Sequence, residues 1–412
     1  KSVTNKPTLI ISKSKIGKYA PNKENTSGVH GSPLGENEFE LFLQNIGFSG
    51  DPFIHDSEIY SYFDEKRADD NSKFDEWKAN LESKLQSDKN FRQLWNQFNN
   101  FETSKVELEW SSDEASRVVG GKILNEYGLS NKFIIGGSAD LAASTKQIIS
   151  DNTFGSNNFG GNSIEFGIRE HAMGGIVNGL ALHSNLIPYG STFLVFSDYM
   201  RPSMRLASLM NVNSLFIFTH DSIYLGEDGP THQPIEHLMS LRLIPNLDVI
   251  RPSNSMELIH SYRYALEKRD NPKAIILSRQ NMKFFDNDVS YKDFQTGAYE
   301  FMPGSDITLI ATGSELELAF EISTKLKDLS VQIISAPILN RLNEERLESL
   351  SLNQNIFTIE LGRTIGWDTY IQNIKKSFSI DSFGESAPID QLAEKFNFNA
   401  EKISDEIRSL LN

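Results

Sequence analysis

The chain of 412 residues contains no cysteine. Disulfide bonds, thiolate metal ligands and a cysteine nucleophile are therefore excluded, and their absence fits a reducing compartment. Hydrophobic runs of about 18 residues, the length that spans a bilayer, are also absent. The first residues lack the apolar core of about 7–15 residues that secretory signals contain. We therefore expect a cytoplasmic protein without a membrane partner.

The chain has fewer positively charged than negatively charged side chains. Lys and Arg together number 40 against 55 Asp and Glu, which gives a formal net charge of -15. No basic stripe offsets this balance, so nucleic acid and anionic membrane surfaces are not expected partners. A few focused Arg and His side chains can still reverse the field locally, so a small anionic substrate remains compatible with the sequence.

The length predicts two or three domains. From about residue 111, apolar strand-like segments alternate with helical stretches, which is typical of α/β folds in which open parallel sheets carry helices on both faces. Two successive sheets of this kind are expected. The predicted strands of the first are 133–135, 163–168, 186–193, 215–218, 248–250 and 274–277, and those of the second are 307–311, 331–335 and 356–359.

We expect the domain boundaries at 1–110, 111–290 and 291–412. The first part reads as the tail of a third α/β domain, with a strand at Pro7–Ile11, and continues as a packed helical linker with an apolar stripe over 74–95. Asp69–Ser72 is expected to be a surface loop. The polar segment 281–304 is expected to link the two sheets, and Ser314 is expected to cap the helix that follows it.

The stretch Thr219–Pro234, THDSIYLGEDGPTHQP, follows an apolar strand. It carries two histidines, three carboxylates and two glycines, which are groups suited to proton transfer and to holding a polar substrate. Loops at strand ends often carry function. By composition alone, a solvated polar loop is an equally good interpretation.

Ligands of open α/β sheets bind beyond the carboxyl ends of the strands. The predicted strands deliver acidic, aromatic and basic side chains to this edge. Glu170 lies in the first turn of a glycine-containing helix, where it could also compensate the helix dipole. The glycines of that helix predict close approach of another backbone or a ligand. The side chains at the edge are Asp140, Glu170, Phe193, Phe196, Tyr199, His220 and Arg279.

Seven motifs spread in order over nearly the whole chain resemble those of transketolases, which are thiamine-diphosphate enzymes. The Thr219–Pro234 string is close to diagnostic for that family. The motifs are HGSPLG at His30, GGSADLAAS at Gly136, FGIREHAM at Phe166, STFLVFSDY at Ser191, THDSIYLGEDGPTHQP at Thr219, LSRQN at Leu277 and FGESAP at Phe383.

The resemblance implies transfer of a two-carbon ketol unit from a ketose phosphate to an aldose phosphate, through an enamine intermediate on the cofactor. It assigns Glu170 to the aminopyrimidine of thiamine diphosphate, where this carboxyl promotes proton transfer. Phe193, Phe196 and Tyr199 match the aromatic pocket of that ring. Asp140 matches an acid near the cofactor at the subunit contact.

The resemblance also implies a substrate site. His232 and His30 match histidines that reach the reacting ketose, and Asp228 matches the group that reads a sugar hydroxyl. A surface charge on a helix remains an alternative for Arg117, and a salt bridge at a strand end for Arg279. Ala143 and Lys146 depart from the family pattern near Ser144. The implied phosphate clamp consists of Arg117, Ser144, His220 and Arg279.

One family motif is not found: the Gly-Asp-Gly sequence, followed by Asn, that holds the diphosphate and its metal ion. We therefore expect the chain to lack most of the N-terminal diphosphate-binding domain. The ligands of Mg²⁺ or Ca²⁺ would then lie in the missing segment. The family arrangement implies a homodimer with active sites at the subunit interface, and an N-terminal fragment is a further candidate partner.

Two other functions remain open. A dihydroxyacetone synthase has similar motifs but uses formaldehyde as the acceptor, and the complete phosphate clamp disfavours it. A non-catalytic transketolase-like fragment is the alternative from a different class. The intact Glu170 and Thr219–Pro234 loop argue against it, whereas the missing diphosphate motif argues for it.

Overall fold

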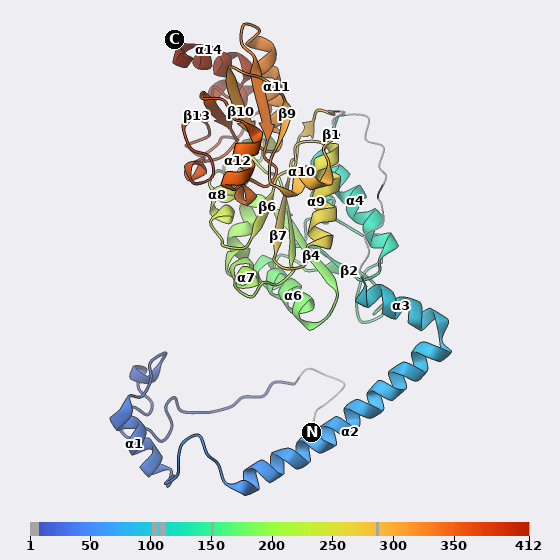
Figure 1. Cartoon of the computed structure of the whole chain (residues 1–412), viewed down its shortest axis with the longest axis vertical. Coiled ribbons are helices and arrows are strands. Elements are labelled where there is room, and N and C mark those ends of the chain that lie inside the picture. Colours follow the sequence, from blue (N-terminus) through green and yellow to red (C-terminus); the bar gives the residue numbers. More distant parts are fainter. Residues whose placement is uncertain (1–7, 101–105, 107–112, 150–151, 286–287, 412) are drawn as a thin grey trace. The chain divides into compact units, whose positions relative to one another are not determined.

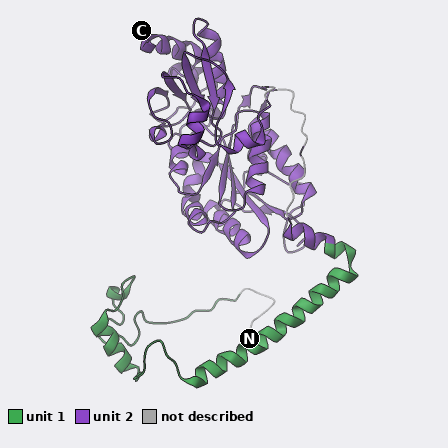
Figure 2. Cartoon of the chain, viewed as in Figure 1, with its two compact units in different colours: residues 1–92 green, residues 93–412 purple. Residues whose placement is uncertain are grey.

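The computed structural model describes residues 8–100, 106, 113–149, 152–285 and 288–411 (Figure 1). The chain forms two compact units, residues 1–92 and 93–412 (Figure 2). No helix in the described ranges is both long and apolar enough to cross a membrane.

The N-terminal unit is helical where it is described. It contains η1 (Ser27–Val29), α1 (Glu36–Asn45) and α2 (Ser57–Ser87), and α3 (Lys89–Asn99) starts at its end. The predicted strand Pro7–Ile11 is wrong for its described residues, which have no regular structure, while Pro7 itself lies outside them. Leu9, Ile10 and Ile11 are 83%, 85% and 76% exposed. A strand needs a neighbour to satisfy its backbone, and the described part of this unit contains none.

Helix α2 runs without interruption through Asp69–Ser72, so the predicted loop there is wrong. Lys73 Nζ lies 2.6 Å from Asp69 Oδ2, one helical turn away, and such pairs support a helix even where the sequence is polar. The predicted apolar stripe is divided at Asp88, whose carboxylate accepts hydrogen bonds from the backbone N–H groups of Asn90 and Phe91 in α3. Part of the stripe is exposed rather than packed: Phe74 and Trp77 are 56% and 53% accessible, whereas Leu81 and Leu85 are half-buried.

The second unit opens with a six-stranded parallel sheet of order β3-β2-β4-β5-β7-β6, which confirms the predicted α/β class. Helices cover both faces: α4 and α9 pack on one core cluster, α6 and α7 on another (Figure 1). The strands are β2 (Ile134–Ser138), β3 (Ser163–Glu165), β4 (Ile187–Phe193), β5 (Leu215–Thr219), β6 (Asp248–Ile250) and β7 (Lys273–Leu277). The helices are α4 (Ser116–Ser130), α5 (Ala142–Thr145), α6 (Glu170–His183), η2 (Leu194–Phe196), α7 (Ser197–Leu209), η3 (Ile223–Leu225), α8 (His237–Arg242) and α9 (Ser255–Glu267).

A second sheet has the order β13-β12-β10-β11-β9, and only β9 runs antiparallel to its neighbour. Its strands are β9 (Tyr299–Met302), β10 (Ile307–Ala311), β11 (Val331–Ser335), β12 (Ile356–Ile359) and β13 (Ile374–Phe378). Its helices are α10 (Tyr291–Gln295), α11 (Glu315–Lys325), η4 (Leu339–Arg341), α12 (Glu344–Leu350), η5 (Trp367–Thr369), α13 (Ile389–Lys395) and α14 (Ala400–Leu411).

Two local predictions for this region are wrong. The expected linker 281–304 holds α10 and β9, and its first two residues form β8 (Asn281–Met282), which pairs with β1 (Glu114–Ala115). Ser314 does not cap α11 with its side chain; its hydroxyl donates instead to Glu315 Oε1 at 2.6 Å. Pairing with β1 and β11 explains the first difference, and a hydrogen bond between adjacent side chains explains the second.

A buried polar network joins the two sheets. The guanidinium of Arg251, which follows β6, donates to Asp221 Oδ2 at 2.7 Å and to the Thr312 carbonyl oxygen at 3.0 Å, and it pairs with Glu315. All four side chains are at most 2% exposed. Because Asp221 directly follows β5 and His220, this network anchors one end of the Thr219–Pro234 loop on the second sheet.

Candidate active site

The carboxyl ends of β2, β3, β4, β5 and β7 meet at one edge of the parallel sheet. Asp140 lies two residues beyond β2 and is exposed, with φ at 61°. Glu170 is the first residue of α6, which follows β3. Phe193 ends β4, and His220 directly follows β5. Arg279 lies two residues beyond β7. The predicted side chains therefore come from five neighbouring strand ends, as the sequence indicated.

The three predicted aromatic residues form a continuous stack. The rings of Phe193 and Phe196 are parallel within 9°, with centroids 5.7 Å apart. Tyr199 continues the stack at 6.0 Å from Phe196, and its side chain is 64% exposed. The stack thus has a buried end at Phe193 and an open end at Tyr199, so a further planar ring could be added to it.

His220 joins this stack from the neighbouring strand. Its ring centroid lies 3.7 Å from that of Phe193, and its backbone has φ at 60°, in the left-handed region. Burial and the positive charges of Arg117 and Arg279 lower the pKa of His220 to about 3, with a smaller effect of His232. The ring is therefore neutral at pH 7. Its Nδ1 lies 2.8 Å from Thr219 Oγ1. When Nδ1 accepts from that hydroxyl, Nε2 carries the hydrogen and can donate to an anion.

The predicted phosphate clamp is partly assembled around this histidine. Arg117, near the start of α4, is half-buried, and its Nη1 donates to the backbone carbonyl of Ser144. Burial and the charge of Arg279 lower the pKa of Arg117. Arg117 is thus not an ordinary surface charge. Among the described residues Arg279 makes no ion pair, so the alternative salt bridge is not formed there.

The three remaining residues predicted to bind substrate, His232, Asp228 and His30, lie in different parts of the structure. His232 packs edge-on against Phe196, with ring centroids 5.6 Å apart, and its Nδ1 lies 2.9 Å from Thr231 Oγ1. Asp228 is exposed on the turn between two glycines. His30 belongs to the N-terminal unit, at the end of η1. The structure therefore brings His232 to the aromatic stack, and the roles of Asp228 and His30 stay predictions.

Glu170 is 8% exposed, and its carboxylate forms no hydrogen bond or ion pair with any described residue. In the same helix, a Cβ on Gly174 would lie 2.8 Å from Ser203 Cβ, which confirms the predicted close approach of another element, α7. Gly175 and Gly179 face open space instead. Its carboxylate oxygens are not fully buried and are therefore open to a ligand or another chain, so Glu170 fits a binding role.

Three family profiles match the chain in sequence order. The profile "Transketolase, thiamine diphosphate binding domain" matches residues 1–100. "Transketolase, pyrimidine binding domain" matches 115–284, and "Transketolase-like TK C-terminal domain" matches 297–399. The chain belongs to the transketolase family. The expectation that most of the diphosphate-binding domain is absent is not supported, because that profile matches the first hundred residues.

Several transketolases are similar over almost the whole chain. That of Staphylococcus aureus (strain MRSA252) is 39% identical, and the match covers 98% of this chain and 64% of that protein. Transketolase from Pichia stipitis in complex with sedoheptulose-7-phosphate superimposes with a TM-score of 0.91 at 29% identity, covering 99% of this chain and 63% of that one. The chain thus spans less than two thirds of the length of these relatives.

A shorter transketolase matches a different share of the chain. The structure of a split-gene transketolase, described as an inactive beta4 tetramer, gives a TM-score of 0.60 at 25% identity. The match covers 72% of this chain and 98% of that one.

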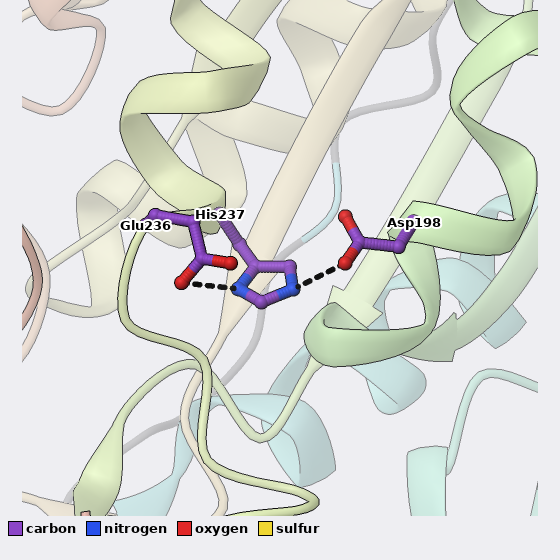
Figure 3. A group of neighbouring side chains, drawn as sticks. All are labelled: Asp198, Glu236 and His237. Atoms are coloured by element: carbon purple, nitrogen blue, oxygen red, sulfur yellow. Dashed lines mark hydrogen bonds and ion pairs between the residues drawn. The ribbon is translucent and has the colours of Figure 1, made fainter. Parts of the chain in front are cut away.

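Only one group of three close metal-binding side chains occurs among the described residues of this transketolase family member: Asp198, Glu236 and His237 (Figure 3). The imidazole lies between the two carboxylates. Its Nε2 is 3.1 Å from Asp198 Oδ2, and its Nδ1 is 3.9 Å from Glu236 Oε2. Nε2 is within hydrogen-bond distance of the Asp198 carboxylate, whereas Nδ1 is buried without a hydrogen-bond partner among the described residues. One ligand atom of each side chain lies within 4.8 Å of the other two, so the group could hold a metal ion, although exposed acidic groups are common without one.

Sequence reasoning missed two kinds of residue. Thr219, which orients His220, lies within a quoted motif, but a hydroxyl beside a histidine gives no signal of its own. The second sheet was given no part in the site. Yet Arg117 and Arg279 also line a cavity of about 710 Å³ whose opposite wall includes Ser314 and Glu317. Such a contact between distant segments can be found only in the folded chain.

Proposed function

We propose that this chain supplies the pyrimidine-binding part of a transketolase, which transfers a two-carbon ketol unit from a ketose phosphate to an aldose phosphate. His220 carries this proposal because it belongs to two groups at once. Its ring stacks on Phe193, and it lies in the electrostatic field of Arg117 and Arg279. An aromatic pocket for a cofactor ring and a cationic site for a phosphate are thereby adjacent.

The cofactor is proposed to be thiamine diphosphate. Its aminopyrimidine would extend the stack of Phe193, Phe196 and Tyr199, and Glu170 would bind the ring through its unpartnered carboxyl. Asp140 is the further acid proposed near it. When bound, the cofactor would supply the carbanion chemistry of the transfer, while the chain orients it and moves protons. The catalytic residues are proposed to be Glu170, His232 and His30.

The substrate residues are proposed from the same geometry. Arg117 and Arg279 supply two guanidinium groups for the phosphate, which suits the bidentate pairing that phosphates favour. The neutral His220 adds a hydrogen-bond donor, and Ser144 lies beside Arg117. Asp228 would read a sugar hydroxyl, and His232 and His30 would contact the reacting carbons.

We propose a homodimer with the site at the subunit contact. The neighbouring helices α6 and α7 expose apolar side chains, among them Ile176 at 46% and Leu209 at 69%. Such a surface favours a protein partner. A separate N-terminal fragment is a further proposed partner, supported by the split-gene relative, and Mg²⁺ or Ca²⁺ would be bound outside the cluster of Figure 3.

The domain division is proposed at 1–110, 111–290 and 291–412. The three profiles support it because each lies within one of these ranges. A cytoplasmic location is proposed because a chain without cysteine fits a reducing compartment.

Two variants test the function. In the active assembly with thiamine diphosphate and Mg²⁺, Glu170→Ala should abolish turnover with every donor because the proton-transfer group is lost, while the circular dichroism spectrum stays that of the parent. Arg279→Ala should raise KM for phosphorylated donors by about tenfold or more and leave unphosphorylated donors less affected. Activity like that of the parent in Glu170→Ala would contradict the proposed function, and equal KM effects on both donor classes would remove Arg279 from the clamp.

Two measurements distinguish the proposed function from the two alternative functions. Ribose 5-phosphate and formaldehyde, offered as acceptors to the same assembly, distinguish a transketolase from a dihydroxyacetone synthase. Titration of the chain alone with thiamine diphosphate and Mg²⁺ tests the non-catalytic interpretation. Binding would argue against a non-catalytic fragment, whereas no binding would show that a partner fragment is required.

A further inference from the structure

The FGESAP motif, Phe383–Pro388, contributes none of the candidate site residues. It lies between β13 and α13 and belongs to the second sheet region. It contacts Gln233 and the Gly226–Gly229 turn, which carries Asp228; both lie more than 150 residues earlier in the chain. Glu227 and Ser386 are 159 residues apart, so no local sequence pattern can predict this contact.

Ser386 contacts the backbone on both sides of Asp228. Its hydroxyl donates to the carbonyl oxygen of Glu227, with an Oγ to O distance of 2.5 Å. On the other side, Gly229 has φ at 79°, and a Cβ there would lie 3.2 Å from Ser386 Cβ. Asp228 therefore lies between a carbonyl that Ser386 hydrogen-bonds and a glycine that has Ser386 close beside it.

A second contact connects the same motif to the residue after His232. Gln233 is 2% exposed, and its Nε2 donates to the carbonyl oxygens of Gly226 at 3.1 Å and of Glu385 at 2.9 Å. A Cβ on Gly384 would lie 1.9 Å from Gln233 Oε1, so only glycine permits this approach. The motif thus fixes the turn and the base of the loop together.

We propose that Ser386 is a positioning residue that holds the Gly226–Gly229 turn and thereby sets the affinity of Asp228 for the donor sugar. The proposal rests on the proposed function. Asp228 is exposed and flanked by glycine at 229, so without a support its carboxylate would lose conformational freedom when it binds a hydroxyl. Holding the turn in advance removes part of that cost. The effect should therefore fall on KM and not on kcat.

Amide hydrogen exchange tests the contact without any turnover. Ser386→Ala in the full chain should accelerate exchange of the Gly229, His232 and Gln233 amides about three- to tenfold, as expected for the loss of one hydrogen bond. These amides donate to carbonyls within the same turn. Ser379→Ala is the matched control, because among the described residues that hydroxyl hydrogen-bonds only to Asp381, at 3.3 Å. It should leave the exchange of these amides unchanged. Unchanged exchange in Ser386→Ala would overturn the proposal.

A double-mutant cycle tests the route to the substrate. Ser386→Ala should raise KM for a ketose phosphate about three- to tenfold with kcat nearly unchanged. In the Asp228→Ala background the same change should have no further effect. Additive effects would refute action through Asp228. An assembly that transfers from no donor while Ser386→Ala still accelerates exchange would refute the proposed function and leave the contact established.

Discussion

The two compact units differ in what their apolar side chains do. In the N-terminal unit, the described residues include only two buried ones, Ala20 and Glu38, and the aromatic stripe of α2 is exposed. In the second unit, every residue of β2, β4, β5 and β7 is buried. A helical apolar pattern is therefore not sufficient for a core: burial requires a second surface, which the parallel sheets obtain from their own helices.

The largest expected effect separates the units by stability. Phe216→Ala, within β5, removes a side chain of 0% exposure and should lower the free energy of unfolding by about 3–5 kcal/mol. Phe74→Ala, in α2, removes one of 56% exposure and should change it by no more than about 0.5 kcal/mol. Urea denaturation measures both. Similar losses would mean that α2 is covered by another surface in solution.

A smaller effect concerns the pH dependence of stability, which we expect from His220 in the second unit. The folded-state pKa of His220 is about 3 against 6.5 for the free side chain. Between these values the unfolded chain binds more protons, so stability falls as the pH falls below about 6.5. The loss should be on the order of 2 kcal/mol between pH 6.5 and pH 5. Urea denaturation at both pH values should show a smaller loss for His220→Asn. An identical pH slope in the two proteins would refute the assignment to His220.

The smallest effect compares two glycines of α6. At concentrations where the chain is monomeric, Gly179→Ala should raise stability by up to about 1 kcal/mol, because alanine favours the helix and the position faces open space. Gly174→Ala should lower it, because Ser203 leaves no room for a Cβ. Denaturation curves of the two variants measure both changes in stability. A destabilised Gly179→Ala monomer would show that this face is already covered within the chain.

Much of the fold follows from local pattern. Continuous apolar runs such as 215–218 predicted buried strands, and the strand ends predicted which side chains share an edge. The pattern failed where ion pairs or sheet pairing decided the outcome. Asp69–Ser72 continues helix α2, and the pair of Lys73 with Asp69 across one turn supports the helix there. Tyr299–Met302 is a strand because β11 offers it an edge.

The candidate site was predictable as a set of residues but not as an arrangement. The aromatic stack and the approach of Arg117 to Ser144 agree with the resemblance. The left-handed backbone of His220 was not foreseen. Its lowered pKa was not foreseen either, because it depends on burial and on the charges of Arg117 and Arg279 from distant segments.

The sequence by itself determined the α/β class, the side chains at the carboxyl ends of the strands, and the family. Those features depend on periodicity and on motifs within short segments. The tertiary structure alone decided that the second sheet region supports the Thr219–Pro234 loop, through Arg251 at one end and Ser386 at its middle. These hydrogen bonds join residues 30 and 159 positions apart and form only after the chain has folded. No local pattern encodes them.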